Sequence, residues 1–156
     1  MAKILVINSG SSSLKCKVID TTTQNETFQA HVDGIGLETC VLKINDNKEE
    51  KKLDNHLQAI KEVLHYVDVH SLDGVGHRVV HGGERCISTT LITDDVIETI
   101  RDLSSLAPLH NPANLQGILA CQEALPDLPQ VAVFDTSFHQ TMPNHAYMYS
   151  IPRKFY

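Results

Sequence analysis

Residues 3–18, KILVINSGSSSLKCKV, decide how this chain folds. The apolar run KILVIN has the length and composition of a buried strand, and Asn8-Ser9-Gly10 ends it with residues that are typical of turns. After the turn, apolar and polar residues alternate with a period close to two, which indicates a second strand. The stretch therefore predicts a strand, a turn and a second strand.

The next residues continue this pattern. Apolar and polar residues alternate again over residues 28–32, and residues 40–44 are a further candidate strand. We therefore expect the first 45 residues to form an antiparallel meander of three or four strands. Residues 45–52 are polar and charged, and we expect a solvated loop there.

Beyond this point helical and strand patterns alternate. Apolar residues spaced four, three, four and three apart predict a helix with one buried face, at Leu53, Leu57, Ile60, Leu64 and Val67. Thr93 is expected to cap a second helix, and Asn111 a third with Pro112 at its first helical position. Strands are expected at residues 73–80, 130–134 and 146–151. This order predicts an α/β fold in which helices cover a mixed sheet.

Composition and charge exclude several classes of protein. The 156 residues, 42% hydrophobic and 21% charged, suit one globular domain. A net charge of −6, with no run of Lys or Arg longer than two, argues against a nucleic-acid binder. No apolar stretch approaches the ~20 residues of a membrane span. The four cysteines form no CxxC pair, which favours reduced thiols in a cytoplasmic protein over a zinc site.

The segment NSGSSSLK, residues 8–15, offers groups that bind anions. Its glycine and serines provide N–H and hydroxyl donors, and Lys15 adds a positive charge. It is not a Walker A loop, because a strand follows where that motif requires a helix. A polar hairpin turn without a ligand is the alternative.

The segment GHRVVHGGE, residues 76–84, places an arginine inside an apolar strand. Burying an unpaired guanidinium would be costly, so Arg78 must face a cleft or a carboxylate. Its partner is either an anionic substrate or a structural ion pair, for which Glu84 is the nearest candidate.

Two further residues stand at the ends of elements. His110 lies one residue before a helix cap, where free N–H groups can receive an anion; it could equally be a surface or structural histidine. Asp135 follows the strand at residues 130–134, where open α/β sheets place ligands and metals. Its carboxylate could hold Mg²⁺ through water, or it could close the strand with an Asx turn.

Four segments in this order, VINSGSSSLK, GHRVVHGGE, LAPLHNPANLQGI and VAVFDTSFHQTMP, resemble the acetate kinases. The resemblance covers most of the chain, although residues 21–52 contribute little to it. It implies a ribonuclease-H-like α/β domain of the actin, sugar-kinase and Hsp70 superfamily. It also implies reversible phosphoryl transfer from ATP to acetate, which gives acetyl phosphate and ADP and depends on Mg²⁺ or Mn²⁺.

The resemblance also implies roles for individual residues. The phosphates of ATP would contact four of them: Asn8, Ser11, Ser13 and Lys15. Asn8 would in addition lie at the metal. Three residues would be catalytic: Arg78, His110 and Asp135. Arg78 would bind acetate, and Val80 and Leu109 would form the walls of a small pocket for its methyl group. Acetate is already a carboxylate at neutral pH, so we expect His110 to donate a hydrogen bond instead of acting as a base.

Chains of that family are more than twice as long as this one. The resemblance therefore implies that residues 1–156 form the N-terminal domain, that a second, nucleotide-binding domain lies outside them, and that they have no useful kinase activity alone. The full-length protein is expected to be a cytoplasmic homodimer without nucleic-acid or membrane partners. Two alternatives remain: a propionate or butyrate kinase of the same family, and a non-catalytic binding domain of the same fold.

Overall fold

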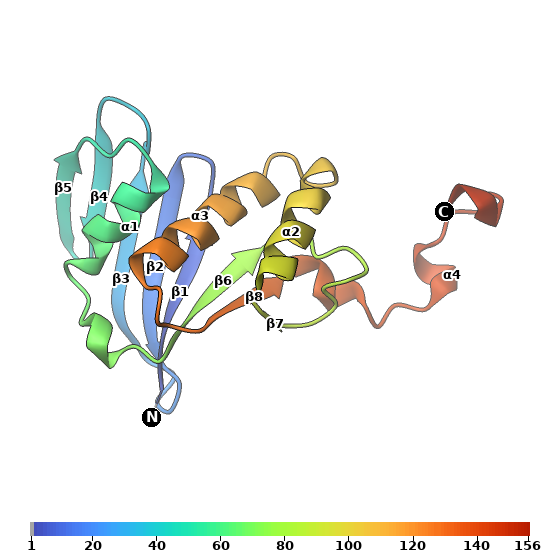
Figure 1. The fold of residues 1–156 in the computed structure, drawn as a ribbon, viewed down its shortest axis with the longest axis horizontal. Helices are drawn as coiled ribbons and strands as arrows, with labels where there is room; N and C mark the ends of the chain where they lie inside the picture. The colour runs from blue at the N-terminus through green and yellow to red at the C-terminus, as the bar shows by residue number, and fades with distance from the viewer. Residues whose placement is uncertain (1) are drawn as a thin grey trace.

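A computed structural model describes residues 2–156. Within them the strands form one eight-stranded mixed sheet with the order β5-β4-β3-β2-β1-β6-β8-β7. The helices α1 (His56–Leu64), α2 (Asp94–Asp102) and α3 (Asn111–Ala124) cover one face of this sheet (Figure 1). The predicted mixed sheet with flanking helices is confirmed.

The first five strands form the antiparallel meander. They are β1 (Lys3–Ser9), β2 (Ser13–Asp20), β3 (Glu26–Asp33), β4 (Cys40–Ile44) and β5 (Asn47–Lys51). The loop predicted at residues 45–52 is wrong, because β5 pairs with β4 along its whole length. Strand β5 is polar since it lies at an edge of the sheet and most of it is exposed; charged residues are typical of such edges.

The second half of the sheet is parallel and determines where the site lies. Strand β6 (Gly74–Val79) runs parallel to β1, with Ile7 beside His77, and β8 (Gln130–Phe134) runs parallel to β6, with Val79 beside Phe134. The short β7 (Thr90–Leu91) joins β8 antiparallel at the edge. The carboxyl ends of β1, β6 and β8 therefore meet at one side of the sheet, where open α/β sheets bind ligands.

The three helices form where they were predicted, but the cap of one of them is shifted by one residue. Asn55 caps α1 by accepting a hydrogen bond from the Gln58 N–H at 3.0 Å, and Thr93 stands at the N-cap of α2. Helix α3, however, has His110 at its N-cap and Asn111 as its first residue. The predicted Asn111 cap is wrong by one residue, because its side chain is buried and bonds to the loop after β6.

The core lies between the sheet and these helices. One apolar cluster joins the meander to α1 and the C-terminal half of α3, and a second joins β6 and β8 to α2 and the N-terminal half of α3. All four cysteines are free and buried, as predicted for reduced thiols. Among residues 2–156, no helix combines the length and the apolar character that a membrane crossing requires.

The strand predicted at residues 146–151 is wrong. The short helix α4 (Asn144–Tyr147) and a bend occupy this segment, which projects away from the sheet (Figure 1). Within residues 2–156 the segment pairs with no strand of the sheet, whose edge next to β8 is occupied by β7. Its apolar side chains, including Tyr149 and Ile151, are exposed.

Candidate active site

A guanidinium joins two of the predicted site residues. Arg78 Nε donates to both carboxylate oxygens of Asp135 at 3.1 Å, and its Nη2 donates to Asp135 Oδ2 at 2.6 Å. Arg78 Nη1 donates to Asn8 Oδ1 at 3.4 Å. The ends of β1, β6 and β8 thus each contribute, directly or by the next residue, one side chain to a single cluster.

The pleat of the strands puts these groups on the face opposite the helices. Arg78 lies between His77 and Val79, which are buried toward the helices, so its own side chain faces the other way. Asn8 Oδ1 meets Arg78 on that face, and Lys15 is the cross-strand partner of Asn8 and therefore shares it. Hence the open face of the sheet carries the charged members of the site.

Arg78 forms an ion pair within the chain, but not with the partner suggested by the sequence. Its partner is Asp135, and Glu84 instead accepts a hydrogen bond from the Tyr156 hydroxyl at 2.5 Å. Hydrogen bonding to Asp135 raises the pKa of Arg78. Both side chains are almost half exposed, 49% for Arg78 and 43% for Asp135. A pair so exposed contributes only about 0–1 kcal/mol to stability, so a ligand can displace it at little cost.

The carboxylate of Asp135 does not form the Asx turn that was one of its two predicted roles. Within the described part of the chain it accepts hydrogen bonds from Arg78 and none from the backbone that follows it, so no Asx turn closes β8. A 3₁₀ helix over Asp135–His139 ends the strand instead. The first residue of this 3₁₀ helix, Asp135, places its carboxylate at the tip of β8, where Arg78 donates to it.

The loop predicted to bind phosphate connects β1 and β2. The N–H of Gly10 donates to the Ser13 carbonyl at 2.8 Å, and Ser11 and Ser12 between them are exposed. Ser13 shares a face of β2 with Lys15, two residues on. The loop thus leads directly into the strand face that carries Ser13 and Lys15.

A second group of predicted residues lies at the start of α3. His110 and Leu109 are exposed, Leu109 by 80%, and Val80 is half-buried. The N–H of Val80 donates to Asn114 Oδ1 at 3.1 Å, which docks the first turn of α3 against the end of β6. Among the hydrogen bonds of residues 2–156, none joins the His110 side chain to Arg78 or Asp135. The structure thus connects the two groups through the backbone of residues 78–80.

The site also contains buried polar residues that the sequence analysis did not select. Asn114 and Asn111 hold the end of β6, and His56 contacts the loop after β1 through Gly10. All three lie in or at the start of helices. The His56 ring and the two asparagine amides are buried. Two asparagines three residues apart in α3 share one helix face, and that spacing is the signal that could have found them.

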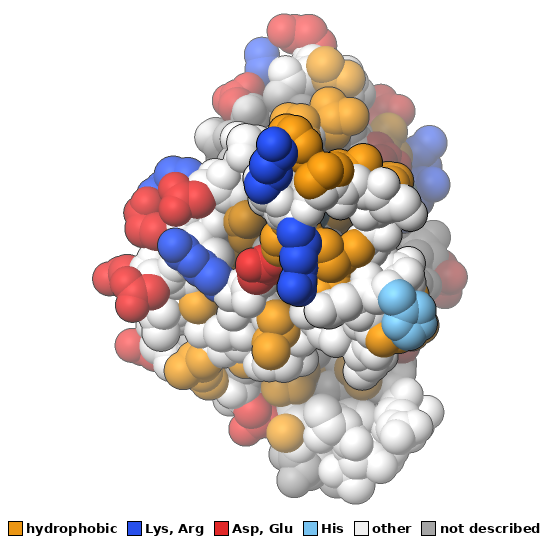
Figure 2. Space-filling model, turned by 90° about the vertical axis from the view of Figure 1, so that its right-hand side faces the viewer, with side chains coloured by type: hydrophobic (Ala, Val, Ile, Leu, Met, Phe, Trp, Pro, Cys, Tyr) orange, Lys and Arg blue, Asp and Glu red, His pale blue; other side chains and the backbone are white. Residues whose placement is uncertain are grey.

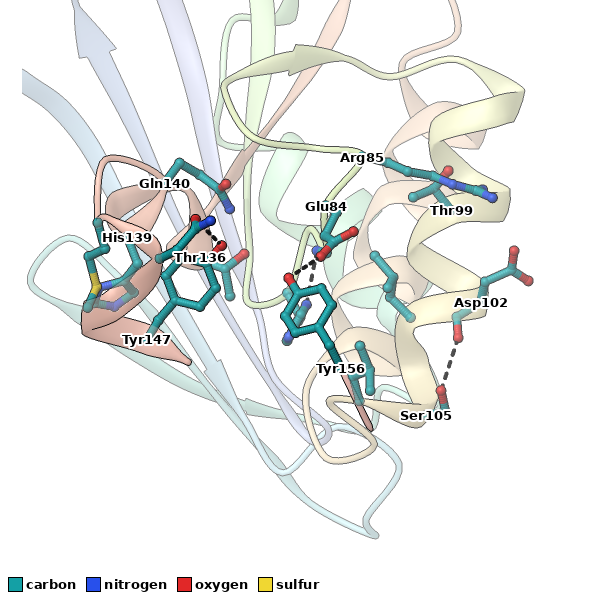
Figure 3. A pocket seen from close by; sticks show the side chains of 16 residues that line it. Glu84, Arg85, Thr99, Asp102, Ser105, Thr136, His139, Gln140, Tyr147 and Tyr156 are labelled. Atoms are coloured by element: carbon teal, nitrogen blue, oxygen red, sulfur yellow. Dashed lines mark hydrogen bonds between the residues drawn. The ribbon is translucent and has the colours of Figure 1, made fainter. Parts of the chain in front are cut away.

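A large hollow lies beside the site without including it. It has a volume of about 1020 Å³ and is lined by residues such as His81, Glu84, Thr136, His139 and Tyr156 (Figure 3). His81 and Thr136 follow the ends of β6 and β8, but Arg78, His110 and Asp135 do not line it. Figure 2 shows the end of the molecule from which residues 144–156 project, where separate hydrophobic patches alternate with basic and acidic side chains.

Comparison with known proteins identifies the family. The sequence model of the Acetokinase family matches residues 3–156. The chain belongs to the acetokinase family. It is 49% identical over 167 residues to the acetate kinase of Thermoanaerobacterium thermosaccharolyticum, and 44% identical over 167 residues to that of Bacillus subtilis. These alignments cover 99% and 100% of the chain, but 42% of either relative.

Solved structures show the acetokinase fold directly. An acetate kinase from Porphyromonas gingivalis superposes with a TM-score of 0.91 at 40% identity, and a propionate kinase from Francisella tularensis with 0.89 at 39%. Each comparison covers 99% of this chain and 42% of the solved one. The predicted actin-like architecture is therefore confirmed, and the chain spans about 42% of the length of its acetokinase relatives.

Proposed function

We propose that this chain forms the phosphate- and acetate-binding domain of an acetate kinase, which transfers a phosphoryl group between ATP and acetate. One observation carries the proposal: the guanidinium of Arg78 is shared by Asp135 and Asn8 at the ends of three adjacent strands. The family match and the names of the relatives support the same activity.

The side chains suit the chemistry of phosphoryl transfer. This reaction requires the protein mainly to position the reactants and to neutralise charge on the transferring oxygens. Arg78 would bind the carboxylate of acetate and the transferring group, while Lys15 and the serine loop would hold phosphate. His110 would donate a hydrogen bond to the transferring group. Val80 and Leu109 would contact the methyl group of acetate.

The donor set of the site also fits a divalent cation. Asp135 and Asn8 both present oxygen atoms to the same guanidinium, and Mg²⁺ is bound by such oxygens together with water and phosphate. Asp135 and Asn8 would therefore hold Mg²⁺ or Mn²⁺ when nucleotide is bound. The ion would supply positive charge to the phosphate oxygens.

The remaining parts of the active site belong, in this proposal, to a second domain outside residues 1–156. The relatives are more than twice as long as this chain, which supports a separate adenosine pocket. We accordingly expect no useful kinase activity from these residues alone. The complete protein would be a homodimer, and the free, buried cysteines are in keeping with a cytoplasmic location.

Propionate is the alternative acceptor, because one of the solved neighbours is a propionate kinase. One added methylene changes discrimination by only ~1–3 kcal/mol, so the preference depends on how closely Val80 and Leu109 contact the acyl chain. Turnover of acetate, propionate and butyrate by the complete protein distinguishes these acceptors.

An acyl-hydroxamate assay with ATP, Mg²⁺ and acetate tests the proposed activity in the complete protein. Arg78→Ala is expected to lower kcat about a thousandfold, since arginines of this kind are worth at least that much in phosphoryl transfer. Arg101→Ala is the matched control, because Arg101 lies on α2 and pairs with Glu98. Equal activity of the Arg78 and Arg101 variants would refute the assigned role. Full turnover by residues 1–156 alone would refute the need for a second domain.

A further inference from the structure

The loop between β1 and β2 has its carbonyl groups turned into the protein. The Ser9 carbonyl accepts from Asn114 Nδ2 at 2.8 Å, and the Gly10 carbonyl lies 2.7 Å from His56 Nε2. The Ser12 carbonyl accepts from two backbone N–H groups of the segment after β3, each at 2.9 Å. Three carbonyl oxygens of the loop therefore accept hydrogen bonds from donors within the protein.

The orientation of the carbonyls determines where the N–H groups point. In a trans peptide the C=O of one residue and the N–H of the next point in opposite directions. An inward Gly10 carbonyl thus turns the Ser11 N–H outward. Across residues 2–156, neither Ser11 nor Ser12 donates its N–H to an acceptor, and both residues are exposed. The bend therefore offers an outward N–H at Ser11 and a further N–H without an acceptor at Ser12, and such groups can bind an anion.

We propose that His56 and Asn114 are positioning residues that orient this loop toward a phosphate-type anion. The inference rests on the proposed function and adds to it two side chains that do not touch the substrate. They act through the carbonyl groups of Gly10 and Ser9. If the Gly10 carbonyl turned outward, its oxygen would repel the anion and the Ser11 N–H would turn away from it. The Ser9 carbonyl acts differently, because its bond to Asn114 fixes where the loop leaves β1.

His56 can serve this role in only one arrangement of its proton. The ring is buried, with 6% of the residue exposed, and a carbonyl oxygen is solely an acceptor. His56 Nε2 must therefore carry a hydrogen and donate it to Gly10. His56 is the first residue of α1, and Asn55 caps this helix. His56 and Gly10 are 46 residues apart in the sequence.

Asn114 connects the loop to the acetate-binding strand. Its Nδ2 donates to the Ser9 carbonyl while its Oδ1 accepts from the Val80 N–H at 3.1 Å, and these partners fix which amide atom is which. Asn114 is 4% exposed. One buried amide therefore sets the distance between the end of β1, which begins the phosphate loop, and the end of β6, which carries Arg78.

Titration of the ¹⁵N-labelled chain with inorganic pyrophosphate tests the proposal, with sodium chloride at equal ionic strength as reference. We expect the Ser11 and Ser12 amide signals to shift with pyrophosphate alone. His56→Ala and Asn114→Ala should each weaken pyrophosphate binding about tenfold, the effect of one well-placed hydrogen bond. His56→Gln retains an N–H donor and should restore most of the affinity. His65→Ala, an exposed histidine at the end of α1, should leave it unchanged.

The outcomes separate the two proposals. If the parent chain shows no shift at residues 11–12, the loop binds no phosphate, and the assigned phosphate site fails together with this inference. If the parent binds and both alanine variants bind as well as it does, only the positioning role is refuted. Urea denaturation of each variant reports any purely structural effect, because that would lower stability without changing the affinity of the folded protein.

A measurement on the parent protein covers the case in which a variant does not fold. The imidazole ¹⁵N spectrum should show His56 with its proton on Nε2 and in slow exchange with water, because the ring is buried. A neutral His56 protonated on Nδ1 cannot donate to Gly10, and that result would overturn its role.

Discussion

Replacing Gly117 by alanine is expected to destabilise the chain, although alanine is the better helix former. A Cβ at position 117 would lie 2.6 Å from Ser9 Cβ and 2.9 Å from Ser9 Oγ, whereas apolar carbons pack at about 3.5–4.0 Å. Helix α3 would have to move roughly 1 Å away from β1. Overpacking of this kind costs about 1–3 kcal/mol, and the gain in helix propensity offsets only about 1 kcal/mol.

With a mid-range overpacking cost of about 2 kcal/mol, the net loss of stability is about 1 kcal/mol, which corresponds to a fall in Tm of roughly 2–4 °C for a domain of this size. Urea denaturation followed by circular dichroism measures it. Gly76→Ala is the matched control, because a Cβ there would meet its nearest neighbours at ordinary distances of 3.8 and 4.0 Å. A Gly117→Ala protein as stable as the parent, or more so, would show that α3 does not lie so close to Ser9.

Three further predictions concern single polar side chains. Ser9→Ala should leave stability unchanged or raise it by up to about 1 kcal/mol in urea denaturation, because Ser9 Oγ is buried and lacks a hydrogen-bond partner within the described residues; a large loss would reveal a missing partner. Burial lowers the pKa of His77 to about 4 in the folded chain, so the unfolded chain gains a proton first and stability falls as the pH drops from 6.5 toward 4. Comparing urea midpoints at pH 7 and pH 5 should show a smaller fall for His77→Gln than for the parent, and an equal fall would contradict this cause. In the complete protein, His110→Ala should lower kcat about a hundredfold or more and retain any fall in rate at low pH that the parent shows; loss of that acidic limb would mean that His110 acts as a base.

Patterns within a few neighbouring residues predicted much of this fold. The alternation in residues 3–18 and the spacing of apolar residues before Val67 depend on contacts within one element, and both produced the expected strands and helix. Strand β5 was not predicted because it is an exposed edge strand, and such a strand lacks the alternation of apolar and polar residues that indicates a strand. Asn111 was misplaced because its amide bonds across the chain to His81 and leaves the capping position to His110.

The partner of Arg78 shows where prediction from sequence stops. Glu84 was considered because it is near in sequence, whereas Asp135 is 57 residues away. Only the pairing of β6 with β8 brings Asp135 beside Arg78, and two helices and β7 lie between those strands along the chain. Nothing in the residues around position 78 encodes that neighbour. The contacts of His56 and Asn114 with the loop between β1 and β2 could not be predicted for the same reason, since each connects segments far apart in sequence.

The two faces of the sheet carry different groups of residues of the candidate site. Asn8, Lys15 and Arg78 project from the open face, while the side chains that orient the same strand ends, His56 and Asn114, lie among the helices on the other face. Successive residues of a strand alternate between faces, so a residue that contacts the ligand has neighbours in the core. The helix face can therefore change the geometry of the site through the backbone alone, without any contact with a ligand. Substitutions there should alter anion affinity while leaving the charged side chains intact, which is the behaviour expected of the Asn114 variant.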